Sequence, residues 1–165
     1  MQFNTDSSFV GVERLKHTHQ RQIADFQRWA AQDDWERFHS SHYDWWAFPI
    51  DQKSSYGLMW TVYEGEITEL KMDSSFLEGY RRGVTLVAAS WGWDLANQSH
   101  LVDPKPGQSW HRWPVRLYKA VYSVKLFSYL DLFESLRKYA RELIEQGEPI
   151  SYAGYNLSGI FTDPG

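Results

Sequence analysis

The chain has 165 residues, a formal net charge of −4, and 9 Trp, 10 Tyr and 9 Phe residues. It contains no cysteine, which excludes disulfides, thiolate catalysis and cysteine-ligated zinc sites. It has no basic block to follow a phosphate backbone and no apolar run long enough to cross a membrane. We therefore expect no nucleic-acid partner and no stable membrane insertion, and instead one soluble, cytoplasmic domain over residues 1–165.

The first part of the chain predicts a lead-in followed by short helices. Residues 1–13 carry polar residues and glycine without a period, so we expect a flexible lead-in there. A helix is predicted over residues 18–31, where Thr18 could cap it and apolar residues recur at helical spacing. The acidic pair at 33–34 is a candidate cap for a second helix, and a third short helix should end before Pro49.

The middle of the chain predicts two capped helices. Thr61 and Glu64 have the spacing of a capping box, in which two side chains bond reciprocally to free backbone N–H groups. A short strand over residues 58–63 is the alternative for this stretch. Asp73 is a candidate cap for the next helix, whose apolar residues recur every three or four positions until Gly92 ends it.

Two more helices are predicted after a long loop. Residues 97–112 form that loop, and Pro114 suits the first turn of the helix that follows it. Asp131 could cap the last helix, and residues 148–165 should form an irregular tail. The prediction is therefore an all-α fold, a compact single-domain bundle of about five to seven helices with its core in residues 14–147.

Four short segments occur in an order that carries more information than any one of them. They are HYDWWAFPI at 42–50, VYEGEITELK at 62–71, FLEGYR at 76–81 and WGWDL at 91–95. Their order and spacing resemble the conserved N-terminal region of the opioid growth factor receptor family over about residues 25–144. The resemblance implies a mainly helical domain in a family whose named member binds an enkephalin-type opioid peptide. It implies no catalytic residues.

Two aromatic segments are the candidate ligand-binding site. Adjacent residues on a helix point about 100° apart, so one tryptophan of the pair at 45–46 can enter the core while the other lines a surface. A second pair lies where the long loop meets the next helix. These segments predict an aromatic groove for a peptide or protein segment. The candidate residues are His42, Asp44, Trp45, Trp46, Trp110, His111, Arg112 and Trp113. Core packing of the same aromatics is the alternative.

A small enzyme or metal-dependent protein is the runner-up. His39 and His42 would share a helix face with Asp44 nearby, and these side chains could bind a metal ion. Half-buried histidines bonded to the backbone are the alternative. Ser90 in a Ser-x-Gly sequence resembles a nucleophile elbow but lies on a helical stripe, which favours a helix-terminal serine. An oligomeric scaffold is the third hypothesis. We favour a non-enzymatic binding module without a cofactor.

Overall fold

The structure is a computed structural model that describes residues 1–152, 155–156 and 158–162. Helices account for most of these residues, and eight are present. Four are long: α1 (Val12–Ala31), α5 (Ser74–Ser90), α6 (Pro114–Leu126) and α7 (Leu130–Glu145). Four are short: α2 (Trp35–Ser40), α3 (Asp44–Ala47), α4 (Glu64–Lys71) and α8 (Gly159–Thr162).

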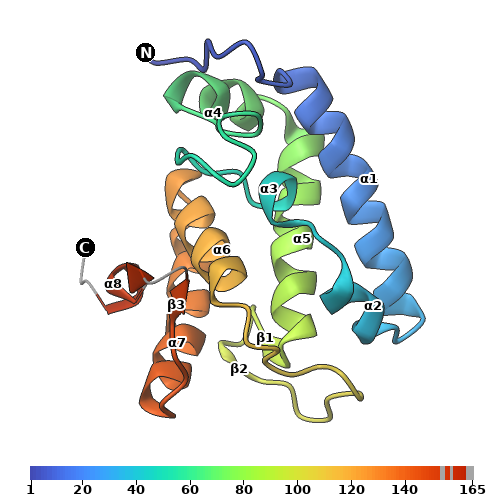
Figure 1. Ribbon diagram of the computed structural model, residues 1–165. Helices are drawn as coiled ribbons and strands as arrows, with labels where there is room; N and C mark the ends of the chain where they lie inside the picture. The colour runs from blue at the N-terminus through green and yellow to red at the C-terminus, as the bar shows by residue number, and fades with distance from the viewer. Residues whose placement is uncertain (153–154, 157, 163–165) are drawn as a thin grey trace.

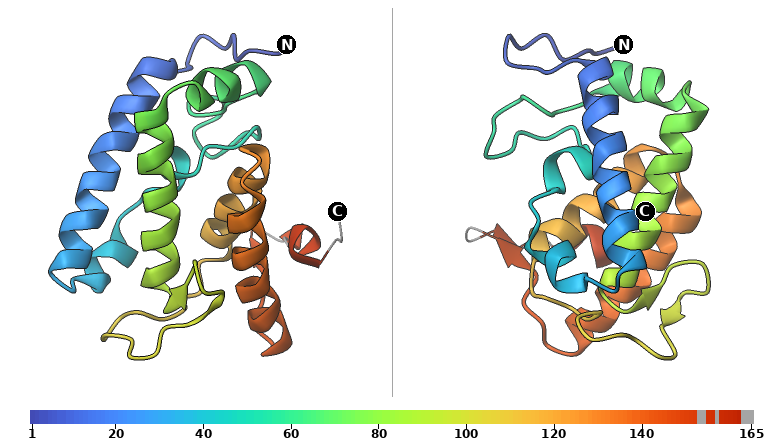
Figure 2. Two further views of the ribbon diagram at one scale, coloured as in Figure 1. Left: turned by 180° about the vertical axis from the view of Figure 1, so that it is seen from behind. Right: turned by 90° about the vertical axis from the view of Figure 1, so that its right-hand side faces the viewer.

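The long helices form two packed pairs. Helix α1 packs along α5, and α6 packs along α7. Helix α5 lies between α1 and the α6–α7 pair in both the front and the back views (Figures 1 and 2). Helix α4 covers one end of this arrangement, and the loop that precedes α6 covers the other. None of the helices in the described part of the chain is both long and apolar enough to cross a bilayer.

Two short antiparallel strand pairs correct the all-α prediction to a helix-rich one. Strand β1 (Trp93–Asp94) pairs with β2 (Ser99–His100), and β3 (Ser151–Tyr152) pairs with β4 (Tyr155–Asn156). The chain reverses between the first two strands in residues 95–98, and Gly92, which follows α5 with a φ of 78°, accepts a hydrogen bond at its carbonyl from Leu101 N at 2.8 Å. The tail predicted to be irregular contains β3, β4 and α8, which also raises the helix count above the predicted range. Its residues 153–154, 157 and 163–165 lie outside the described residues.

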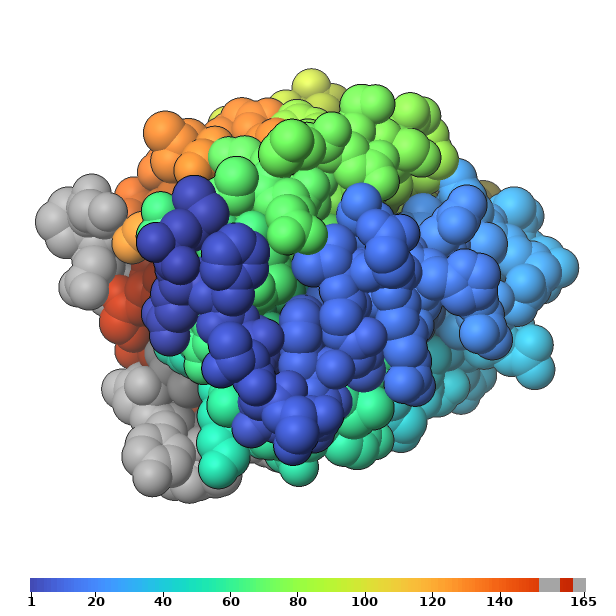
Figure 3. All heavy atoms as spheres, turned by 90° about the horizontal axis from the view of Figure 1, so that it is seen from above, coloured from blue at the N-terminus to red at the C-terminus, as the bar shows by residue number. Residues whose placement is uncertain are grey.

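The N-terminal segment, expected to be a flexible lead-in, is fixed by contacts with α4 and the preceding loop. The backbone N–H of Asn4 donates to Glu66 Oε1 at 2.9 Å. Its side-chain amide donates to the carbonyl oxygens of Leu58 and Thr61 at 2.9 and 2.8 Å. The segment lies across α4 in the space-filling view from above (Figure 3). Asn4 is 9% exposed, so it belongs to the folded domain.

The core that joins the two helix pairs is largely aromatic. The ring of Tyr80 on α5 stacks on Phe127 with 4.6 Å between ring centroids. Its hydroxyl lies 2.7 Å from Ser123 Oγ on α6, which in turn donates to the carbonyl of Pro49 at 2.8 Å. All three side chains in these contacts are buried. The polar end of a core tyrosine is therefore satisfied inside the fold, as burial requires.

The acidic caps predicted from the sequence hold for two helices and fail for another. Asp34 Oδ1 accepts a hydrogen bond from Arg37 N at 3.2 Å, and Asp73 Oδ1 accepts one from Phe76 N at 3.1 Å. Both confirm the predicted caps of α2 and α5. Helix α7 begins at Leu130, so the predicted cap Asp131 lies inside its first turn.

Candidate functional site

Asp44, predicted to orient a ligand, is bound to a buried arginine instead. Arg116 on α6 is 2% exposed, and its Nε donates to Asp44 Oδ1 at 3.1 Å. The same guanidinium donates from Nη1 to the carbonyl of His39 at 2.7 Å and from Nη2 to that of Ser41 at 2.6 Å. A buried carboxylate is tolerated when it is paired in this way. Asp44 therefore fixes the segment 39–44 to α6.

The predicted tryptophan pair on α3 is half-buried. Trp46 donates from Nε1 to Gln22 Oε1 on α1 at 2.8 Å, while Trp45 packs edge-on against Tyr56 with 4.8 Å between centroids. The ammonium of Lys119 lies 5.2 Å from the centroid of the Trp45 ring, and burial lowers the pKa of this lysine. Asp44, Trp45 and Lys119 line a cavity of only about 10 Å³, which is about one water in size.

The second aromatic pair packs on other elements. Trp110 lies against Trp91 and Tyr139, with centroids 5.7 and 6.4 Å away. Trp113 is 44% exposed, and the guanidinium of Arg116 lies 5.0 Å from its ring centroid. Arg116 thus lies against both Asp44 and Trp113, but the cavity beside Trp45 includes neither Trp110 nor Trp113.

The remaining predicted site residues, His42, His111 and Arg112, are exposed. His111 is exposed, and its ring stacks on that of His39 with 3.5 Å between centroids. Arg112 is also exposed, and its Nε lies 3.7 Å from Glu148 Oε2. His42 faces solvent. None of the three lines the cavity beside Trp45.

The alternative metal set of His39, His42 and Asp44 does not converge either. The Nε2 atom of His39 lies 2.8 Å from the carbonyl oxygen of Gly107, and burial lowers the pKa of its imidazole to about 4. Across residues 1–152, 155–156 and 158–162, no three His, Cys, Asp or Glu side chains are grouped to hold a metal ion. The alternative of histidines bonded to the backbone therefore holds for His39, but it is wrong for His42, which is exposed.

The position of Ser90 agrees with the alternative prediction of a helix-terminal serine. It is fully buried at the end of α5, and its hydroxyl donates to the carbonyl of Val87 at 2.6 Å. A nucleophile elbow needs a strand before the serine and a helix after it, whereas here a helix precedes it. Ser90 is therefore a helix-terminal serine.

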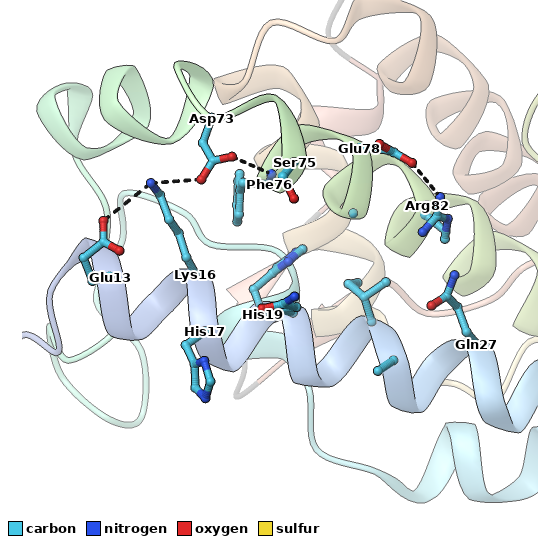
Figure 4. Close-up of a pocket in the computed structure, with 14 residues that line it drawn as sticks. Glu13, Lys16, His17, His19, Gln27, Asp73, Ser75, Phe76, Glu78 and Arg82 are labelled. Atoms are coloured by element: carbon cyan, nitrogen blue, oxygen red, sulfur yellow. Dashed lines mark hydrogen bonds and ion pairs between the residues drawn. The ribbon is translucent and has the colours of Figure 1, made fainter.

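A groove between α1 and α5 is the candidate site that the structure adds. Its volume is about 590 Å³, within the range of about 300–1,000 Å³ that is typical of ligand pockets. We call it the α1–α5 groove. The buried side chains of His19, Ile23 and Phe76 form its floor. Its charged rim consists of Glu13, Lys16, Asp73, Glu78 and Arg82 (Figure 4).

Ion pairs neutralise most of the charge at the rim of the groove. Lys16 Nζ lies 3.1 Å from Asp73 Oδ2 and 3.6 Å from Glu13 Oε1. The hydrogen bond to Asp73 raises the pKa of Lys16 above its ordinary value. Farther along α5, Arg82 Nη2 lies 2.9 Å from Glu78 Oε1. Both basic groups of the rim are thus engaged by carboxylates from the same rim.

His19 is the polar residue of the groove floor. It is 2% exposed, and its ring contacts those of Phe76 and Tyr80 with 4.7 and 6.2 Å between centroids. Burial lowers the pKa of its imidazole to about 4, although a hydrogen bond to the carbonyl of Ala47 acts in the opposite direction. Its Nε2 atom is buried and has no hydrogen-bond partner in the described part of the chain. Figure 4 shows the ring extending from α1 into the space between the helices.

A sequence signal for this groove existed in α5. Gly79 and Gly83 lie one turn apart on the helix, and a Cβ added to Gly83 would come 2.6 Å from Ile23 Cδ1 on α1. Glycines at this spacing inside an apolar stripe indicate a close helix–helix approach. Gly79, which has no side chain, lines the groove and leaves space between the two helices.

Comparisons with protein-family models, with curated proteins and with solved structures find no match to this chain. The resemblance to the opioid growth factor receptor family therefore stays a prediction based on the order of its motifs.

Proposed function

We propose that this protein is a non-enzymatic binding module that holds a peptide or protein segment in the α1–α5 groove. The observation that carries the proposal is an open pocket of about 590 Å³ with a buried, partly apolar floor and a polar rim. Ten of its fourteen lining residues are polar or charged and could bond to the backbone of a peptide, while Ile23, Ala24, Phe76 and Gly79 supply its apolar part. The motif resemblance supports a peptide as the ligand, and the lack of cysteine is compatible with a cytoplasmic location.

Rigid walls favour binding in this groove. Its two sides are the longest helices of the described residues, α1 with 20 residues and α5 with 17. The Lys16–Asp73 ion pair joins the two walls near one end, and Trp46 ties Gln22 of α1 to α3. A site on preorganised helices loses little conformational entropy when a ligand binds. The ligand would therefore meet the groove already formed.

A matched pair of substitutions on α1 tests the site. Ala24 lines the groove, whereas Ala31 is exposed two helical turns farther along and does not line it. We would select peptides from a random library displayed on phage, using the wild-type protein, and measure their affinity by fluorescence anisotropy. Ala24→Trp should fill the groove and weaken the selected peptides by tenfold or more, a change of about 1.4 kcal/mol. Ala31→Trp should bind them as the wild type does.

Thermal unfolding of both variants controls for misfolding, because each substitution lies at an exposed position and should leave the melting temperature nearly unchanged. Peptides that bind Ala24→Trp as well as the wild type would place the binding site elsewhere. A library that yields no peptide specific for the wild-type protein would contradict peptide binding itself.

A further inference from the structure

The α1 wall of the α1–α5 groove presents polar side chains in one row. Glu13, Gln20 and Gln27 line the groove and follow one another at intervals of seven residues, so they lie on the same face of α1. Figure 4 shows Glu13 and Gln27 near the two ends of this wall. At a rise of about 1.5 Å per residue the row is about 21 Å long, which is the length of about six residues of extended chain.

The polar character of the groove favours an extended segment over a helical one. A bound helix satisfies its own backbone groups and needs an apolar stripe opposite it, whereas only four of the fourteen lining residues are apolar. An extended segment leaves its N–H and C=O groups to be paired by others. Gln20 and Gln27 are exposed, and each side-chain amide contains both donors and an acceptor. These amides are complementary to an extended backbone.

The end of the groove at Glu13 carries a negative charge that the rim does not compensate. Lys16 Nζ lies between two carboxylates, 3.1 Å from Asp73 Oδ2 and 3.6 Å from Glu13 Oε1. At the other end Glu78 and Arg82 form a pair of opposite charges. With histidine counted as neutral, the lining residues contain three carboxylates and two cations. The excess carboxylate is therefore at the Glu13 end.

Glu13 is the carboxylate of this end that a ligand can reach. Its side chain is 91% exposed, against 33% for Asp73 and 23% for Lys16. The 3.6 Å contact between Glu13 and Lys16 is longer than the distance of about 2.7–2.9 Å in a charge-assisted hydrogen bond. Glu13 can therefore turn to a second cation while Lys16 stays paired with Asp73, which also caps α5.

We propose that the α1–α5 groove takes an extended, basic segment of about six residues. Gln20 and Gln27 bond to its backbone, and a lysine or arginine of the segment pairs with Glu13. This inference rests on the proposed function, because it specifies the conformation and the charge of the segment that binds in the same groove. The net charge of −4 of the whole chain favours the approach of a basic segment as well.

The peptides selected from the phage library supply the first test, because they should contain more lysine and arginine than the starting library. In a selected peptide with one basic residue, that residue would be replaced by norleucine, which keeps an apolar stem and removes the charge. Loss of one exposed ion pair should weaken binding about two- to fivefold. In about 1 M salt, where the Debye length is about 3 Å, the two peptides should bind alike.

Glu13→Gln and Glu36→Gln are a matched pair of variants. Each removes one exposed carboxylate, but Glu13 lines the groove and Glu36 does not. Glu13→Gln should weaken the basic peptide about two- to fivefold and leave the norleucine peptide unchanged, whereas Glu36→Gln should bind both as the wild type does. Transferred nuclear Overhauser effects of the bound peptide should be strong between the Hα of one residue and the amide proton of the next, as in an extended chain.

The outcomes distinguish this inference from the proposed function. Selected peptides without basic residues, or a basic peptide that binds the two glutamine variants equally well, would overturn the pairing with Glu13. Overhauser effects typical of a helix would overturn the extended conformation. In both cases weaker binding to Ala24→Trp would keep the groove as the binding site. If Ala24→Trp binds the peptides as the wild type does, the proposed function fails and this inference fails with it.

Discussion

Arg116 is the side chain that holds the segment between α2 and α3 in position. It binds a carboxylate and two carbonyl oxygens that lie 72 to 77 residues away in the sequence. Its guanidinium also lies 4.6 Å from the centroid of the Tyr43 ring. The planar fork of arginine can serve several acceptors at once, which the single ammonium of a lysine does with less specificity. The pair with Asp44 is buried on both sides.

Replacement of Arg116 by Met should destabilise the protein strongly. The variant would leave the buried Asp44 carboxylate without its cation, and the loss of one partner from a buried ion pair costs about 3–5 kcal/mol. We expect a loss of that size in the free energy of unfolding, measured by urea denaturation. The double variant Arg116→Met with Asp44→Leu should recover part of it, because no unpaired charge is then buried.

The matched control for this prediction is Arg81→Met. Arg81 also pairs with an aspartate, since its Nη2 lies 2.8 Å from Asp131 Oδ2, but both side chains are largely exposed. Exposed pairs contribute about 0–1 kcal/mol. Equal losses in the two single variants would show that Arg116 does not organise this region.

Gly79 and Gly83 of α5 should respond differently to replacement by alanine. A Cβ at Gly79 would meet Ile23 Cγ1 at an ordinary 3.9 Å, so Gly79→Ala should gain about 0.5–1 kcal/mol from better helix propensity. A Cβ at Gly83 would lie 2.6 Å from Ile23 Cδ1. The end of the buried Ile23 side chain would have to turn away, so Gly83→Ala should gain less stability than Gly79→Ala. Urea denaturation of both variants compares them directly.

Similar gains in the two alanine variants would contradict the close approach of α1 and α5 at Gly83. Far-UV circular dichroism provides the control, because both substitutions should leave the helix content unchanged.

The N-terminal segment should contribute to stability through Asn4. Its side chain donates to two carbonyl oxygens and accepts from Asp6 N at 3.0 Å. Asn4→Ala removes these bonds, and the carbonyls are left in a largely buried place, which should cost about 1–3 kcal/mol. Asn97→Ala is the control, since Asn97 bonds to Asp94 at an exposed site and its loss should stay within about 0.5 kcal/mol. If Asn4→Ala is as stable as the control variant, the N-terminal segment contributes little to stability, as expected of a flexible lead-in.

Local sequence patterns predicted where each helix lies more accurately than they predicted its first residue. The acidic caps Asp34 and Asp73 are local, and the structure confirms both. The capping box predicted at Thr61 is wrong, because α4 begins at Glu64 and Glu66 accepts from Tyr63 N at 3.0 Å. Glu66 also accepts from the backbone of Asn4, 62 residues earlier. A contact of that range leaves no trace in a local pattern.

At the scale of the whole molecule, the density of aromatics in the sequence indicated the core more than the site. Tyr43 and Phe48, which lie beside the predicted tryptophans, are fully buried, whereas Trp113 is 44% exposed. The groove instead arises where α1 meets α5, and its lining residues lie in two helices separated by more than 40 positions. Spacing within one helix predicts its buried face. It does not predict which other helix leaves part of that face open.

Two buried histidines should make the stability of the molecule depend on pH. Burial lowers the pKa of both His19 and His39 from an ordinary value of 6.5 to about 4. Below pH 6.5 the unfolded chain therefore binds protons that the folded protein does not, so stability falls as the pH falls. The decrease should run from about pH 6.5 to about pH 4.

His19 alone should account for about 3 kcal/mol of this decrease, since each unit of pKa shift corresponds to about 1.4 kcal/mol. We would measure the free energy of unfolding in urea at about pH 7 and about pH 4.5 for the wild type and for His19→Phe. The variant lacks one of the two groups, so its stability should fall less between these values. Carboxylates with lowered pKa values, such as Asp73 and Asp131, lose their contribution mainly at lower pH and are common to both proteins. An equal decrease in wild type and variant would mean that His19 takes up its proton as readily in the folded protein as in the unfolded chain. That result would contradict a buried, neutral imidazole in the folded protein.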